Sequence, residues 1–287
     1  MNKLAILSMD IEDWYHLDYF NTSKCDKNYS LLDGINNYCE LLQKYNIPSS
    51  FFVLGEIAKS ISSTLNEIVS SGNDIGSHSW NHTRPMTIST TEFFDDIIKS
   101  KKSLEDLIGI EIEGFRAPCF SIDRTRLNEV RKAGFSYDSS RIDFSTHPLY
   151  ETINMKGYEL LMNNIYKLDN FFEFQVSTNS VYGKNIPISG GGYLRLLPWF
   201  VSKKLINPYL DRSELYTLYI HPFELSSRSN PSFPKTTKLH NRLRFGIGRS
   251  TVAEKLSRLI YLLKDHGYRF TTFSLLRKEL LGQNTKS

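Results

Sequence analysis

The first half of the chain alternates between short apolar segments and longer amphipathic ones. The apolar segments predict strands at 4–9, 49–55, 74–77 and 114–118, and the amphipathic segments predict helices at 30–45, 90–108 and 124–133. Such alternation is typical of βαβ units, in which successive strands run parallel and helices cover the sheet. The sequence therefore predicts an α/β fold built on a parallel sheet or barrel.

The second half is less regular. Residues 140–215 are rich in Asn, Gly and Tyr, and the clearest strand there is 171–177. A strand at 215–222, a helix at 251–265 and a strand at 268–273 follow. Single α/β barrels commonly have about 250 residues. We therefore expect one domain over 1–287, with core motifs in 4–225 and with the helix and strand of 250–275 completing the barrel.

The charges are interspersed, and they argue against a nucleic-acid partner. The formal charge of +4 comes from 35 basic and 31 acidic residues, without the concentrated basic face that binds phosphate backbones. Much of the excess lies late in the chain, in Lys235, Lys238, Arg242, Arg244 and Arg249. A solvated basic surface is the favoured interpretation of this cluster, and a face toward an anionic lipid or diphosphate carrier is the alternative.

The cysteines and the apolar segments bear on location. Cys25, Cys39 and Cys119 form no CxxC pair, and an odd number gives no disulfide framework, so free thiols are expected. The apolar run before Asp10 is too short for a signal peptide, and no segment approaches about 18 apolar residues. We expect a cytoplasmic protein with no transmembrane segment.

Two groups of residues have the chemistry of a metal site. His78 and His82 are four residues apart, so one helical turn or a tight loop can point both imidazoles in one direction. Asp10, Glu12 and Asp13 follow the first strand, at the sheet edge where parallel α/β folds place their active sites. Two imidazoles and one carboxylate leave coordination positions open for water and substrate.

His221 and Arg116 also follow predicted strands. His221 comes directly after the apolar segment 215–220, which suits a general acid near the same sheet edge. Arg116 leaves a core strand and needs a carboxylate partner or an open cleft, so it could orient a catalytic carboxylate.

Two further features admit more than one interpretation. Gly190, Gly191 and Gly192 lack the lysine of a phosphate-binding loop, and we weigh a close approach to a sugar equally with a structural bend at positive φ. Four aromatic residues could stack on sugar rings, although aromatic residues more often belong to the core. They are Trp14, Tyr15, Trp80 and Tyr193.

An ordered set of motifs carries a resemblance to a known family. The segments MDIED, FFVLG, DIGSHSWNH, FRAP, YDSS and LYIHP, spread over residues 4–273, resemble the polysaccharide deacetylases of carbohydrate esterase family four. The segment IPISGGGYLRLLP, with MDIEDWYH and IHPFE, is similar to a bacterial branch associated with exopolysaccharide and surface-polysaccharide biosynthesis. The resemblance implies a distorted (β/α) barrel of about seven parallel strands.

The resemblance also implies residue roles. Asp10 would be the catalytic base oriented by Arg116, His221 would protonate the leaving amine, and His78 and His82 would bind the metal. The family has two adjacent aspartates where this chain has Asp10-Ile11-Glu12-Asp13, so the carboxylate ligand is Glu12 or Asp13, with Glu12 preferred. A backbone N–H of 137–139 would bind the oxyanion, and Leu218 would shape the acetyl pocket. The predicted substrate-binding residues are Trp14, Pro118, Tyr137, Asp138, Tyr193 and Leu218.

The implied function is a metal-dependent hydrolase that removes N-acetyl groups from an acetamido sugar, in a surface polysaccharide or in a lipid-linked or other precursor. A lipid-linked substrate would bring the enzyme to the inner membrane surface. Zinc is the expected ion, and cobalt, nickel and iron suit the same ligands. The alternatives are a cyclic-amide hydrolase of the same superfamily, resembling allantoinases, and a non-catalytic glycan-binding module. Retention of both histidines favours the metal-dependent amidase.

Overall fold

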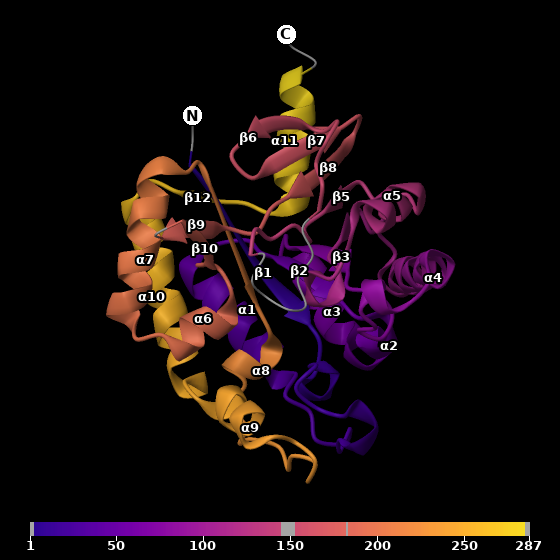
Figure 1. The fold of residues 1–287 in the computed structure, drawn as a ribbon, viewed down its shortest axis with the longest axis vertical. Coiled ribbons are helices and arrows are strands. Elements are labelled where there is room, and N and C mark those ends of the chain that lie inside the picture. The colour runs from indigo at the N-terminus through magenta and orange to yellow at the C-terminus, as the bar shows by residue number, and fades with distance from the viewer. Residues whose placement is uncertain (1–2, 145–152, 182, 285–287) are drawn as a thin grey trace.

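A computed structural model describes residues 3–144, 153–181 and 183–284. Residues 145–152, inside the segment predicted to be irregular, lie outside the described residues. Most of the strands form one curled sheet in the order β11-β1-β2-β3-β4-β5-β8-β7-β6, with β12 beside β1 (Figure 1). The strands of this sheet are β1 (Leu4–Ile11), β2 (Ser50–Val53), β3 (Asp74–Ser77), β4 (Gly114–Phe115), β5 (Tyr137–Asp138), β6 (Glu159–Met162), β7 (Ile165–Leu168), β8 (Phe171–Phe174), β11 (Leu215–Ile220) and β12 (Arg269–Phe270).

The seven strands from β11 to β8 are parallel, as the sequence predicted for an incomplete (β/α) barrel. β7 and β6 continue the sheet antiparallel, and β9 (Thr178–Val181) and β10 (Lys184–Pro187) form a separate hairpin. Helices surround the strands, with α7 and α10 on the opposite side from α4 and α5 (Figure 1). The helices are α1 (Asp33–Tyr45), α2 (Gly55–Ala58), α3 (Ser62–Ser70), α4 (Thr90–Ile108), α5 (Arg124–Lys132), α6 (Gly191–Leu196), α7 (Trp199–Arg212), α8 (Pro222–Leu225), α9 (Leu239–Gly246), α10 (Val252–Asp265) and α11 (Phe273–Asn284).

Side chains of the barrel strands alternate between its interior and the surrounding helices. In β1, Leu7 and Met9 pack in the core between the sheet and the helices, whereas Leu4 and Ile6 pack in the barrel interior. Since successive side chains of a strand point to opposite faces, Ser8 and Asp10 continue the interior row toward the C-terminal end. This alternation places polar side chains at one end of an apolar interior.

The barrel has a seam between β8 and β11, which do not pair with each other in the described part of the chain. Instead the Ser177 amide donates to Thr217 Oγ1 at 2.9 Å, and the Thr217 amide donates to Ser177 Oγ at 3.0 Å. At the N-terminal end of the strands, Phe273 and Leu276 of α11 pack into the interior cluster. Helix α11 therefore fills the end of the barrel opposite Asp10.

Capping residues explain why the N-terminal half agrees with the sequence prediction. α4 begins after Ser89, whose hydroxyl accepts from the Glu92 amide at 3.2 Å, and it ends at Gly109 with φ 71°. The strand predicted at 114–118 is shorter and ends at Phe115. The sequence prediction missed α7, α11 and the two hairpins.

We predict that Gly34→Ala lowers the free energy of unfolding by about 1–3 kcal/mol, because overpacking a close backbone contact forces a shift. A Cβ at Gly34 would lie 1.9 Å from the carbonyl oxygen of Pro222, in the contact between α1 and α8. Denaturant unfolding measures the change. Gly282→Ala is the control, because a Cβ there meets nothing within 4 Å. Equal stability of both variants would contradict the close α1–α8 contact.

Candidate active site

A cavity of about 440 Å³ opens at the C-terminal ends of the barrel strands. It brings together side chains that are far apart in the sequence. Of the predicted catalytic, metal-binding and substrate-binding residues, Asp10, Glu12, His78, His82, Tyr193 and His221 line it. Arg116 lies beneath the cavity, fully buried against Asp10.

Glu12, His78 and His82 form a group suited to a metal ion. Each offers one ligand atom, and these atoms lie within 4.8 Å of one another. The 78–82 segment is a loop rather than a helical turn, and His82 has φ 63°. This left-handed conformation is unusual for a residue other than glycine, and such strain is typical of functional sites. The loop brings the two imidazole rings to 5.3 Å between their centroids.

The surroundings of His78 and of Glu12 suit both side chains to binding a metal ion. His78 Nδ1 lies 2.8 Å from the carbonyl oxygen of Arg116, so that nitrogen donates and Nε2 is left as the ligand atom. Burial lowers the pKa of His78 to about 4, which keeps the ring neutral. Glu12 Oε2 lies 2.8 Å from His82 Nε2, yet it has no partner with hydrogen-bonding geometry among the described residues. An unsatisfied buried carboxylate oxygen between two imidazoles is what a cation site requires.

Glu12 and Asp13 have different surroundings. Asp13 Oδ1 accepts hydrogen bonds from the amides of Trp14 and Leu31, at 2.8 and 2.9 Å, and so caps the short 3-10 helix Trp14–His16. The structure thus places Glu12, and not Asp13, beside the two histidines.

Arg116 fixes the orientation of Asp10. Its Nη1 donates to Asp10 Oδ1 at 2.7 Å and to Ser8 Oγ at 2.8 Å. Its Nε and Nη2 donate to the carbonyl oxygen and the hydroxyl of Ser139, both at 2.9 Å. The guanidinium also lies 4.1 Å from the centroid of the Phe52 ring. One carboxylate oxygen of Asp10 is therefore held by a charge-assisted hydrogen bond inside the barrel.

His221 follows β11 directly and faces the group of Glu12, His78 and His82. Two residues that the sequence analysis missed hold His221 in place. His221 Nδ1 lies 3.3 Å from Glu224 Oε2, and Arg195 Nε donates to Glu224 Oε1 at 3.3 Å. Burial lowers the pKa of His221, but the hydrogen bond and charge of Glu224, with the charges of Glu12 and Asp10, outweigh it and raise this pKa to about 9. Glu224 stands three residues after His221 at the start of a short helix, and that spacing was the available sequence signal.

Gly190 and Gly191 have a packing role at this point, and a Cβ on Gly190 would lie 2.8 Å from the hydroxyl oxygen of Tyr219. A Cβ on Gly191 would lie 1.8 Å from Glu224 Oε2, so the carboxylate occupies the space of that side chain. Of the two interpretations of this glycine run, the bend at positive φ is wrong, because none of Gly190, Gly191 and Gly192 adopts one. Gly191 thus lets Glu224 reach both Arg195 and His221.

Three of the predicted substrate-binding residues do not line the cavity. The alternation of side chains along the strands turns them away from it. Leu218 packs in the core between sheet and helices, and its neighbour Tyr219 lines the cavity. Tyr137 belongs to the apolar barrel interior, and its hydroxyl donates to Asp74 at 3.2 Å. Asp138 is fully buried, away from the cavity, and accepts hydrogen bonds from Ser140.

Other residues predicted to bind the substrate also lie outside the cavity lining. Trp14 is fully buried in an aromatic cluster, and its indole N–H donates to the carbonyl oxygen of Tyr29. Pro118 is buried outside the cavity lining. The amides of Tyr137 and Ser139, expected to bind an oxyanion, already donate to the carbonyls of Glu113 and Phe115. Of the four aromatic residues considered for stacking on sugars, only Tyr193 lines the cavity.

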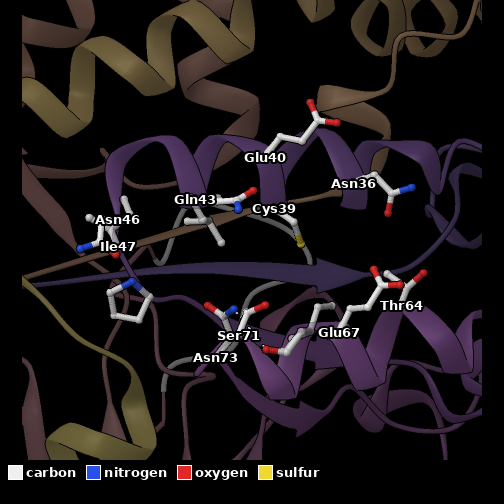
Figure 2. Close-up of a pocket in the computed structure, with 13 residues that line it drawn as sticks. Asn36, Cys39, Glu40, Gln43, Asn46, Ile47, Thr64, Glu67, Ser71 and Asn73 are labelled. Atoms are coloured by element: carbon white, nitrogen blue, oxygen red, sulfur yellow. Dashed lines mark hydrogen bonds between the residues drawn. The ribbon is translucent and has the colours of Figure 1, made fainter.

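A second groove on the protein is lined by a different set of residues, most of them polar. Between α1 and α3, a groove of about 670 Å³ is lined by polar side chains such as Asn36, Gln43 and Asn73 (Figure 2). It contains the Cys39 thiol, whose pKa burial raises to about 11, so the thiol stays protonated and unreactive at neutral pH. This groove has no histidine, and catalytic chemistry is concentrated at the barrel end.

Comparisons with known proteins agree with this geometry. Residues 26–137 match the family described as polysaccharide deacetylase, and residues 144–276 match a domain of unknown function, DUF3473. A peptidoglycan deacetylase from Helicobacter pylori is 28% identical over 117 residues, which are 41% of this chain and 40% of that protein. The match thus spans less than half of that relative.

Solved structures share the fold at low sequence identity. A protein assigned as a polysaccharide deacetylase from Mycobacterium smegmatis has a TM-score of 0.64 and 17% identity, covering 99% of this chain and 92% of that one. A CE4 family pseudoenzyme from Bacillus anthracis has a TM-score of 0.55 and 15% identity, covering 96% and 66%. The fold alone therefore does not establish catalysis.

Strands from both matched regions share one sheet. β2 to β5 come from the first region, and β8 and β11, with His221, Glu224 and Arg195, come from the second. Residues 26–137 are therefore similar to polysaccharide deacetylases, and the chain shares the fold of the solved structures described above.

Proposed function

We propose that this protein is a metal-dependent hydrolase that removes acetyl groups from the acetamido sugars of a surface polysaccharide or of its precursor. One observation carries the proposal. The Glu12, His78 and His82 group lies in one cavity with a carboxylate held by arginine, Asp10, and an imidazole held by a carboxylate, His221. A base, an acid and a cation site around one cavity are the parts that amide hydrolysis needs.

Glu12, His78 and His82 would hold the ion. When bound, a divalent metal supplies Lewis acidity, which polarises the acetyl carbonyl and lowers the pKa of water. Two imidazoles and one carboxylate suit zinc, and also cobalt, nickel or iron.

The side chains of the chain supply the proton transfers. Asp10, held by Arg116, accepts a proton from the attacking water as its oxygen bonds to the acetyl carbon. The carbon–nitrogen bond then breaks, and His221 donates a proton to the leaving amine, so that acetate and a free amino sugar result. The raised pKa of His221 keeps its imidazole protonated at neutral pH, as a general acid requires.

The cavity lining supports a sugar substrate. Tyr19, Tyr193, Phe120 and Tyr219 surround the polar group, and a mostly apolar lining with a few convergent polar side chains is typical of small-molecule sites. Acetate release from a panel of acetamido sugars and glycans, with and without a chelator, tests the proposal. The panel includes a cyclic amide such as allantoin, since its hydrolysis would favour the alternative amidase. Glycan binding without any turnover would favour a non-catalytic module.

We expect the base and the metal ligands to have different mutant phenotypes. Asp10→Asn keeps an oxygen that accepts from Arg116 but removes the proton acceptor, so turnover should fall by about 10²-fold or more while metal remains bound. His78→Ala should lower metal content, and added metal should restore part of the activity. Steady-state rates and elemental analysis measure both effects.

The control is Asp106→Asn, an exposed position on α4. Near-normal turnover of Asp10→Asn, or metal loss as complete as in His78→Ala, would move the role of base from Asp10 to another carboxylate.

Metal removal should abolish turnover and leave the protein folded. The site residues are held by contacts within the protein, such as His78 to the Arg116 carbonyl and Asp10 to the guanidinium, within a large core. Circular dichroism and acetate release, measured before and after chelation, test this expectation. Global unfolding on chelation would contradict it.

Glu224→Gln should move the alkaline limb of the pH–rate profile to lower pH by about one unit, because it removes the negative charge beside His221. In the wild type, the pKa of His221 is raised to about 9, so the protonated acid is lost only as the pH rises through that value. The matched control is Glu254→Gln, on the exposed face of α10. An alkaline limb that stays in place in Glu224→Gln would remove His221 from the role of acid.

A further inference from the structure

Helix α9 has an apolar face that the rest of the described protein leaves uncovered. Leu239, Leu243 and Ile247 are 70%, 53% and 52% exposed, and their spacing of four residues places them on one face. Phe245, on the other side of the helix, is fully buried. Helix α9 therefore packs by one side, and a row of large aliphatic side chains on the other side meets solvent. Grouped exposed apolar side chains of this kind mark interaction surfaces.

The segment that contains this face has basic residues and no acidic ones. Between Leu225 and Ala253 there are six Lys and Arg residues and no Asp or Glu. Because the whole chain has a net charge of +4, the residues outside this segment carry a net charge of −2. Arg228, Arg242 and Arg249 donate to backbone carbonyls, and within the described part of the chain none of the six basic side chains pairs with a carboxylate. Lys235 and Lys238 are exposed, so their positive charge is available to an external partner.

The same helix borders the mouth of the active-site cavity. Asn241 and Arg244 of α9 line the cavity, together with the partly exposed Leu196 of α6. Arg195 fixes the two helices together, since its Nη1 donates to the carbonyl oxygens of Phe245 and Ile247 at 3.1 and 2.8 Å. In Figure 1, α9 lies near α8, at the opposite end of the molecule from β6 and β7.

We propose that α9 docks on an anionic membrane surface, with Leu239, Leu243 and Ile247 entering the interfacial region and the flanking basic side chains contacting acidic headgroups. Aliphatic side chains beside lysine and arginine are the composition that binds such interfaces. A second copy of the chain is a poor occupant, because an isologous contact would bring two positive segments together. No helix among the described residues is long and apolar enough to span a bilayer, so α9 would lie on the surface.

Docking would present the cavity mouth to glycans held at the membrane. The inference goes beyond the proposed function, and it can be tested without turnover.

Cosedimentation of the full-length protein with vesicles of phosphatidylglycerol and phosphatidylcholine tests the proposal. We expect binding to these vesicles, weaker binding to phosphatidylcholine alone, and loss of binding as salt screens the charges. The double variant Leu239→Ser/Leu243→Ser should lower the partition coefficient by about tenfold or more. Lys235→Gln/Lys238→Gln should lower binding to the anionic vesicles and weaken its salt dependence.

Leu160→Ser is the matched control, since Leu160 is 57% exposed on β6 at the other end of the molecule. Its binding should equal that of the wild type. Circular dichroism and acetate release from a soluble substrate confirm that each variant is folded. Vesicle binding without acetate release would overturn the proposed function and support docking.

Three results would overturn docking. They are no binding of the wild type to anionic vesicles at low salt, equal binding of the leucine variant, and a concentration-dependent dimer that the leucine variant abolishes.

Discussion

Arg116 places a full positive charge at a position without solvent contact, inside a ring of strands. A buried charge is tolerated only with close partners, and here they come from β1 through Ser8 and Asp10 and from the segment after β5 through Ser139. The Arg116 backbone carbonyl accepts from His78 in addition. One residue therefore positions the proposed base through its side chain and a proposed metal ligand through its main chain. Its removal would leave Asp10 buried without a countercharge.

Side chains alternate between the two faces of each strand, and this alternation determines which site residues could be predicted from the sequence. Asp10, His78 and His221 follow apolar strands, and their place at the barrel end could be predicted because parallel strands end at the same edge. The face of a residue within a strand depends on register, which a shift of one position reverses. For this reason Leu218 was assigned to the pocket that Tyr219 lines, and Asp138 to a cleft that it does not face. The resemblance of motifs does not fix that register.

The residues behind His221 could not be predicted for a different reason. Glu224, Arg195 and Gly191 meet through contacts between α6, α8 and α9, which are short helices of 6, 4 and 8 residues. The glycine run signalled an unusual site, but the cause is a carboxylate in the place of a side chain rather than a bent backbone. Such a cause becomes visible only when the tertiary neighbours are known. The second matched region, of unknown function, thus contains the proposed acid, His221, and the residues that hold it.

Helix α11 gives the barrel a closed floor, since Phe273 and Leu276 fill the interior below the polar layer. The cavity is therefore a blind pocket rather than a tunnel, and no glycan strand can thread through the barrel. Under the proposed function, a polymer would lie across the mouth and offer one acetamido group to the pocket. Acetate and the deacetylated strand would then both leave on the side from which the substrate arrived, so each round of the reaction would clear the mouth before the next sugar could occupy it.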